Sequence, residues 1–162
     1  MRSSSPDRWQ LGLDMFGMKA ALETIICNNH YNFLCEITAD SSDEGMEEPH
    51  RTVLFRICQE ALTNAARHAE ASRVTITIQR EKDCWVLIVT DNGKGFVVEK
   101  QMKYTDSCGL SSMWGRVRYL GGAFKIESSP GGGTRIHATV PATIPRKDSD
   151  SENFRISSID CV

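Results

Sequence analysis

The chain has 162 residues, of which 40% are hydrophobic and 25% are charged, and its formal net charge is −2 at pH 7. These values are typical of a single soluble domain with a hydrophobic core. A nearly balanced charge disfavours nucleic acid as the main partner. No apolar run approaches the roughly 20 residues of a membrane-spanning helix, and the polar N-terminus lacks the apolar core of a signal peptide. We therefore expect a cytoplasmic protein.

The six cysteines give no sign of a metal or redox site, because no pair has the close spacing of a zinc knuckle or a redox motif. Cys58 and Cys84 lie in apolar patterns and are expected in the core. A disulfide scaffold is not expected in a chain with so much other core material.

Hydrophobic periodicity predicts an alternation of helices and strands. Helices are expected over residues 11–27, 49–66 and 110–120. Strands are expected over residues 33–38, 73–79, 84–90, 124–127 and 134–140. This order predicts an α+β fold, a two-layer α/β sandwich in which three helices cover one face of a mixed sheet of about five strands.

The remaining segments are predicted to lie outside these elements. Residues 1–10 are expected to be disordered or an expression remnant, and the acidic, Ser-rich residues 39–48 a surface loop. Residues 97–108 are polar, with no apolar period, and are expected to be irregular. The folded domain should cover residues 11–141, followed by a flexible tail over residues 142–162.

The stretch from Leu87 to Gly95 places an acidic residue at the end of a predicted strand. Asp91 follows four strand-forming residues, and the chain then turns at Gly93 and Gly95. A carboxylate beside backbone without side chains is suited to hold the amino edge of a purine. Asp-Asn-Gly also occurs in ordinary surface turns, so this stretch alone does not decide between the two.

A row of polar side chains lies on the second predicted helix. Glu60, Asn64 and His68 are spaced four apart and therefore share one helix face. An acid, an amide and an imidazole in one row are suited to a hydrated cation and phosphate oxygens, because Mg²⁺ prefers oxygen ligands and keeps several waters. The alternative is a solvated helix face.

Two further glycine-containing segments follow along the chain, and the first is compatible with phosphate binding. Gly109 opens a predicted helix, whose first N–H groups attract phosphate, although a plain capping glycine has the same sequence. Residues 131–134, Gly-Gly-Gly-Thr, form a flexible turn entering a strand. By itself this turn is an ordinary hairpin connection.

Taken in order, these four segments closely resemble the ATP-binding domain of sensor histidine kinases, in the superfamily of GHKL ATPases. The motifs are Glu60-xxx-Asn64, Asp91-x-Gly93-x-Gly95, Gly109-Leu110 and Gly131-x-Gly133-Thr134. The segments 56–64 and 109–113 bring the match closer to the subfamily of nitrate and hexose-phosphate sensors. The resemblance covers residues 11–141 and implies the Bergerat fold of histidine kinase-type ATPases.

The resemblance implies a set of residues around the adenine. Asp91 would accept a hydrogen bond from the adenine amino group, and Gly95 would let the base lie close. Gly93 and Phe96 would frame the nucleotide. Thr134 would support the adenine through Asp91 or through a water molecule.

At the phosphate end, the resemblance implies that Asn64 ligates a Mg²⁺ ion that bridges the phosphates of ATP. Glu60 would be catalytic, polarising a water molecule or the incoming imidazole. His68 and the backbone at Gly109 and Leu110 would face phosphate oxygens. Residues 97–108 would form a short lid that orders when the nucleotide binds.

The resemblance implies the catalytic ATP-binding half of a two-component sensor kinase, which transfers the γ-phosphoryl group of ATP to a histidine. None of the four histidines here is followed by an acidic residue, as the acceptor in that subfamily is. His30 and His50 are expected in surface loops or at helix ends, and His137 in a strand. The acceptor is therefore expected on a dimerisation module outside this chain, and the domain alone is expected to be a monomer.

Further partners would be a response regulator, reached through the full-length kinase, which can be membrane-anchored. The same nucleotide fold occurs in anti-sigma-type serine protein kinases, which are the nearest alternative. A non-catalytic nucleotide-binding scaffold is the alternative from another class. One departure from the subfamily is Gly115, which replaces an acidic residue before Arg116 and costs roughly 1 kcal/mol of helix stability relative to alanine.

Overall fold

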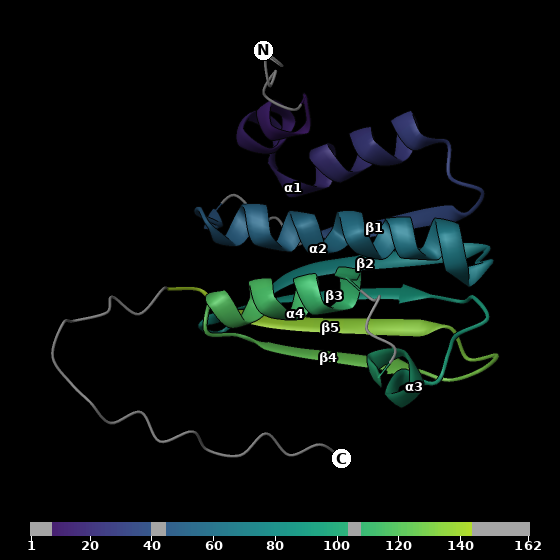
Figure 1. Cartoon of the computed structure of the whole chain (residues 1–162). Helices are drawn as coiled ribbons and strands as arrows, with labels where there is room; N and C mark the ends of the chain where they lie inside the picture. The colour runs from purple at the N-terminus through teal and green to yellow at the C-terminus, as the bar shows by residue number, and fades with distance from the viewer. Residues whose placement is uncertain (1–7, 40–44, 104–107, 144–162) are drawn as a thin grey trace, which may run out of the picture.

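A computed structural model describes residues 8–39, 45–103 and 108–143 and shows one mixed five-stranded sheet covered by helices on one face (Figure 1). The strand order is β1-β2-β3-β5-β4, in which β1 and β2 are parallel and the other neighbours are antiparallel. The strands are β1 (Leu34–Ala39), β2 (Arg73–Glu81), β3 (Cys84–Asp91), β4 (Ala123–Ser128) and β5 (Thr134–Pro141). The predicted fold class is confirmed.

The helices are α1 (Arg8–Asn29), α2 (His50–Asn64), α3 (Val98–Lys103) and α4 (Cys108–Tyr119), and α2 continues into a π-helix, η2 (Ala65–Ala69). Helices α1, α2 and α4 lie over the sheet, whereas α3 packs beside β4 (Figure 1). The crossover from β1 through α2 to β2 makes the parallel pair, since parallel neighbours need such a connection. None of the helices in the described ranges is long and apolar enough to cross a membrane.

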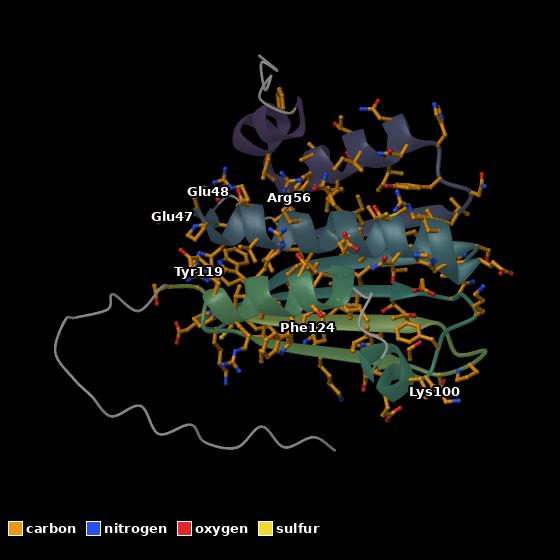
Figure 2. All side chains as sticks on the ribbon, in the orientation of Figure 1. Glu47, Glu48, Arg56, Lys100, Tyr119 and Phe124 are labelled. Carbon is orange, nitrogen blue, oxygen red and sulfur yellow. The ribbon has the colours of Figure 1, made fainter. Side chains whose placement is uncertain are left out.

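The core lies between the sheet and the helix layer. Alternate residues of β2 and β3, such as Ile76 and Leu87, are fully buried against α2 residues such as Leu54 and Ile57. Phe124 on β4, labelled in Figure 2, packs against the same core. Each such aliphatic side chain contributes roughly 1.5–3 kcal/mol on burial. This alternation is the pattern from which the strands were predicted.

Helix α1 differs from its prediction at two points. It begins at Arg8, so residues 8–10, expected to be disordered, are helical; residues 1–7 lie outside the described ranges. It is also broken at Gly17, whose φ of 80° and ψ of 178° are not helical. Glycine adopts this conformation without steric cost, and apolar spacing does not report the break.

The expected surface loop before α2 is partly buried. Met46 is 1% exposed, and its carbonyl oxygen accepts hydrogen bonds from Nε (3.0 Å) and Nη2 (2.7 Å) of Arg51. His50 is at a helix end, as predicted, but it is 3% exposed rather than on the surface. Its Nε2 lies 2.7 Å from the carbonyl oxygen of Pro141. The contact of His50 joins residues 91 apart in sequence, so local patterns could not reveal it.

The stretch expected to be irregular contains α3. Residues 98–103 read Val-Glu-Lys-Gln-Met-Lys, and most of these residue types favour helix. Glu99 in the first turn is well placed against the helix dipole. Six residues are too few to show an apolar period, which explains the missed helix. Residues 104–107, in the predicted lid, and residues 144–162, in the predicted tail, lie outside the described ranges.

Candidate nucleotide-binding site

A pocket of about 720 Å³ opens at the end of the sheet where β3 ends, beneath η2 and the start of α4. Its lining includes every predicted site residue except Gly93: Glu60, Asn64, His68, Asp91, Gly95, Phe96, Gly109, Leu110 and Thr134. These residues come from four separate segments of the chain, at residues 60–68, 91–96, 109–110 and 134. The fold therefore gathers them into one cavity.

Asp91 is the last residue of β3, and its strand position holds it in the pocket. Its Oδ1 accepts a hydrogen bond from the backbone N–H of Gly93 at 2.8 Å. Within the described residues, its Oδ2 has no hydrogen-bond partner. Thr134 is its cross-strand neighbour on β5. The carboxylate is thus fixed by one oxygen and retains the other as an acceptor for a ligand.

The turn after Asp91 is anchored to η2 and β2. Oδ1 of Asn92 accepts hydrogen bonds from the backbone N–H groups of Ser72 (3.0 Å) and Arg73 (2.9 Å). The N–H of Lys94 donates to the carbonyl oxygen of Ala69 at 2.8 Å. A Cβ atom at Gly93 would lie 2.3 Å from that same oxygen. Gly93 is not among the residues that line the pocket. Because it lacks a side chain, the turn can approach the end of η2 closely.

Gly95 has a comparable packing role. Its φ is +60°, and a Cβ atom there would lie 2.0 Å from the carbonyl oxygen of Ser129. The neighbouring N–H of Phe96 donates to Oγ of Ser128 at 2.9 Å, and that hydroxyl donates to the carbonyl of Gly133 at 2.7 Å. Ser128 was missed by sequence reasoning because it lies at the end of β4, outside the glycine motifs. Close approach of the base at Gly95 stays a prediction.

The π-helix changes the row of polar residues on the second helix. Glu60 and Asn64 are on α2, but His68 is on η2, whose wider turn departs from the α-helical spacing assumed in the prediction. His68 and Arg67 both line the pocket. Arg67 was missed, although a basic residue next to His68 at a helix end was a visible signal. Single π-turns inside helices frequently occur at functional sites.

Glu60 and Gly109 are in direct contact. A Cβ atom at Gly109 would lie 2.1 Å from Oε1 of Glu60 and 2.9 Å from its Cδ. The carboxylate therefore lies against the bare Cα of Gly109, at the start of α4. This contact between two segments of the pocket was not predicted.

The pocket wall is apolar where it meets the sheet and polar where it meets the helix ends. Val74, Val89 and Ile136 form the buried apolar part, and Phe96 and Ile126 extend it. This surface suits the faces of a planar base, and the pocket volume is in the usual range of small-ligand sites, about 300–1,000 Å³.

Arg67, His68 and Lys94 also line the pocket and are its basic side chains. Lys94 Nζ lies 2.8 Å from Oε1 of Glu70 at an exposed position. Asn64 offers an amide oxygen of the kind that Mg²⁺ accepts together with phosphate and water oxygens. The residues present thus fit a magnesium-bound nucleotide.

Comparisons with known proteins agree with this geometry. Residues 50–144 match the family described as histidine kinase-, DNA gyrase B-, and HSP90-like ATPase. Over 143 residues the chain is 30% identical to the sensor protein VraS of Staphylococcus haemolyticus and 37% identical to the sensor histidine kinase LiaS of Bacillus subtilis. Each match covers 88% of this chain but only 40% and 38% of those relatives.

Solved structures show the same fold at low identity. The histidine kinase domain of the Erythrobacter litoralis EL346 blue-light activated histidine kinase has a TM-score of 0.62 at 18% identity, covering 78% of this chain and 59% of that one. The chain spans about two fifths of the length of the curated relatives named above. The family match over residues 50–144 shows that the chain belongs to the histidine kinase-, DNA gyrase B-, and HSP90-like ATPase family, and its curated relatives named here are sensor kinases.

Proposed function

We propose that the pocket binds Mg-ATP and presents its γ-phosphoryl group to a histidine on a dimerisation module outside this chain. The observation that carries the proposal is one cavity that holds Asp91 at its sheet end and Glu60 and Asn64 on its helix wall. Adenine would lie on the apolar wall with its amino group toward Oδ2 of Asp91. Its phosphates would then extend toward Asn64, Arg67 and His68.

Phosphoryl transfer depends mainly on how the reacting groups are positioned and on neutralisation of the charge on the phosphates. A nitrogen of the acceptor imidazole attacks the γ-phosphorus, the bond from phosphorus to the β–γ bridging oxygen breaks, and ADP leaves. Glu60 accepts a hydrogen bond from the other ring N–H, which orients the imidazole and leaves the attacking nitrogen unprotonated. Arg67 and His68 stabilise the charge on the phosphate oxygens. Bound through Asn64, Mg²⁺ would supply further neutralisation of the phosphates.

The proposed setting follows from the relatives' description as sensor kinases. The domain would work in the cytoplasm, next to its own histidine-bearing module, and pass the phosphoryl group to a response regulator through the full-length kinase. The isolated domain would be a monomer. Similarity to nitrate and hexose-phosphate sensors remains part of this proposal.

Calorimetric titration with a non-hydrolysable ATP analogue tests the site. Asp91→Asn should weaken binding at least about tenfold, since the carboxylate acceptor is replaced in part by an amide donor. Asn64→Ala should remove most of the dependence of affinity on Mg²⁺. Asp83→Asn in the β2–β3 turn is the matched control for the charge change and should bind as wild type.

The acceptor is then identified by adding the histidine-bearing module with labelled ATP. Phosphohistidine is lost in acid, whereas phosphoserine survives and would favour the serine kinase alternative. A folded wild-type chain that binds no nucleotide would contradict the proposal and favour a scaffold.

A further inference from the structure

Three polar side chains form a row across neighbouring strands at the sheet end of the nucleotide pocket. Ser128 on β4 is paired with Thr134 on β5, and Thr134 is paired in turn with Asp91 on β3. These strands are adjacent in the sheet (Figure 1), and cross-strand partners have their side chains on the same face. Asp91 and Thr134 line the pocket, whereas Ser128 is not among its lining residues.

An apolar row runs parallel to this polar row. Val89, Ile136 and Ile126 are the cross-strand partners two residues along the same three strands, and all three line the pocket. Residues two apart on a strand share a face, so both rows belong to the same pocket floor. A planar base that lies on the apolar row therefore has one edge beside Thr134 and Asp91.

The hydrogen bonds of Ser128 determine the direction of the Thr134 hydroxyl. A serine hydroxyl has one hydrogen to donate and two lone pairs that accept. Oγ of Ser128 donates to the carbonyl oxygen of Gly133 at 2.7 Å and accepts the N–H of Phe96 at 2.9 Å. A third contact, of 3.2 Å, joins it to Oγ1 of Thr134. Because the hydrogen of Ser128 is already used, Thr134 is the donor in that bond.

Thr134 consequently presents only lone pairs to the pocket. Asp91 offers a second acceptor beside it, since its Oδ1 takes the N–H of Gly93 at 2.8 Å and Oδ2 is left for a ligand. A water molecule between these two acceptors would donate both of its hydrogens to them and would also present a lone pair. In either case this edge of the pocket accepts hydrogen bonds and donates none, which matches an amino group and opposes a carbonyl oxygen.

We propose that Ser128 is a specificity-determining residue, which fixes Thr134 as an acceptor and thereby restricts the pocket to purines with a 6-amino group. Ser128 acts through Thr134 and does not touch the nucleotide. A 6-oxopurine is rejected because its O6 has no hydrogen to offer to either acceptor. The inference rests on the proposed function and adds the residue that sets which nucleotide the site accepts.

The test compares ADP with inosine diphosphate, which carries an oxygen in place of the 6-amino group. In calorimetric titrations with Mg²⁺, the wild-type chain should bind ADP at least about a hundredfold more tightly. Ser128→Ala releases the hydroxyl of Thr134, which can then turn and donate to O6, so this preference should fall at least about tenfold. Ser128→Thr keeps a hydroxyl on the same Cβ atom and should retain the preference.

A double substitution shows whether Ser128 acts through Thr134. Thr134→Val removes the hydroxyl with little change in shape, so the preference for ADP should fall as it does in Ser128→Ala. Adding Ser128→Ala to Thr134→Val should then leave the preference unchanged, because no hydroxyl remains to be oriented. Loss of packing alone would weaken binding of both nucleotides equally and would not change the ratio of their affinities.

A matched control is the hydroxyl of Ser112 on α4. Its Oγ accepts a hydrogen bond from Nε of Arg116 at 3.2 Å, and Ser112 is not among the residues that line the nucleotide pocket. Ser112→Ala removes the same atom and should keep both affinities within about twofold of wild type. Urea denaturation checks that each variant is folded. If Ser128→Ala does not fold, Ser128→Cys takes its place, since a thiol is a weak hydrogen-bond partner of similar size.

Three results would overturn the inference: no wild-type preference for ADP, an equal loss of affinity for both nucleotides in Ser128→Ala, or additive effects of the two substitutions on the preference. A folded wild-type chain that binds neither nucleotide would instead contradict the proposed function. The two failures are therefore distinguishable.

Discussion

Replacement of Gly109 by alanine tests whether the position of the Glu60 carboxylate limits catalysis. The added Cβ atom would lie 2.1 Å from Oε1, whereas ordinary van der Waals contact begins at 3.4 Å. The three nearest atoms to that Cβ all belong to the Glu60 side chain. The carboxylate must therefore withdraw by roughly 1 Å or more, a misplacement that can cost about a hundredfold in rate.

The same change should scarcely alter stability. Alanine in place of glycine in the first turn of α4 gains about 0.4–1 kcal/mol through the unfolded chain. Displacing the end of Glu60 to an off-rotamer position costs about 0.5–1.5 kcal/mol. These two contributions oppose each other, so the free energy of unfolding should stay within about 1 kcal/mol of wild type. Urea denaturation measures this directly.

The assay is phosphoryl transfer to the histidine-bearing module, with nucleotide affinity measured in parallel. Gly109→Ala should lower kcat about a hundredfold while nucleotide affinity changes less than about threefold. In a Glu60→Ala background the clash no longer exists, so adding Gly109→Ala should change the remaining rate little.

Two results would refute this reasoning. Parallel loss of nucleotide affinity and rate would mean that Gly109 acts through its backbone on the phosphates. Full additivity of the two substitutions would mean that Gly109 and Glu60 act independently.

The other predictions concern stability. Gly115→Ala should raise the free energy of unfolding by about 0.8–1 kcal/mol in urea denaturation, because the added methyl group meets no atom within 4 Å in the interior of α4. Gly93→Ala should lower the thermal midpoint of unfolding. The added Cβ atom would lie 2.3 Å from the backbone carbonyl oxygen of Ala69, so the backbone at one of the two residues would have to shift. Burial raises the pKa of the Cys58 thiol above its usual value near 9. The unfolded thiol then ionises first as pH rises, so stability should fall above pH 9 by up to about 1.4 kcal/mol per pH unit, and the fall should be shallower in Cys58→Ala.

The strand pattern was predictable from local sequence, whereas the grouping of the motif residues around one pocket followed only from the resemblance of their order and spacing to a known family. Ile76 and Leu87 belong to alternating or continuous apolar runs that directly indicate a sheet with a covered face. The motif residues Asp91 and Asn64 lie at element ends, where side chains converge once the helices cover that face. Neither inference required knowledge of contacts distant in sequence.

The π-helix at the end of α2 could not be predicted in this way. Alanine-rich residues 65–69 favour an ordinary α-helix by propensity. In the fold, however, the carbonyl of Ala69 accepts the N–H of Lys94 at 2.8 Å. It also fits against the bare Cα of Gly93. A contact with the β3 turn thus fixes where the helix must end, and only tertiary structure contains that information.

Three glycines of the motifs lie where two segments of backbone or side chain meet. Gly93 admits the carbonyl of Ala69, Gly95 admits that of Ser129, and Gly109 admits the Glu60 carboxylate. The first two contacts are with backbone, so a side chain there would disturb the pocket wall itself. The third is with the end of a flexible side chain, so a methyl group there displaces a reacting group and leaves the wall in place. Substitution at Gly109 should therefore separate catalysis from folding, which substitution at Gly93 or Gly95 cannot do.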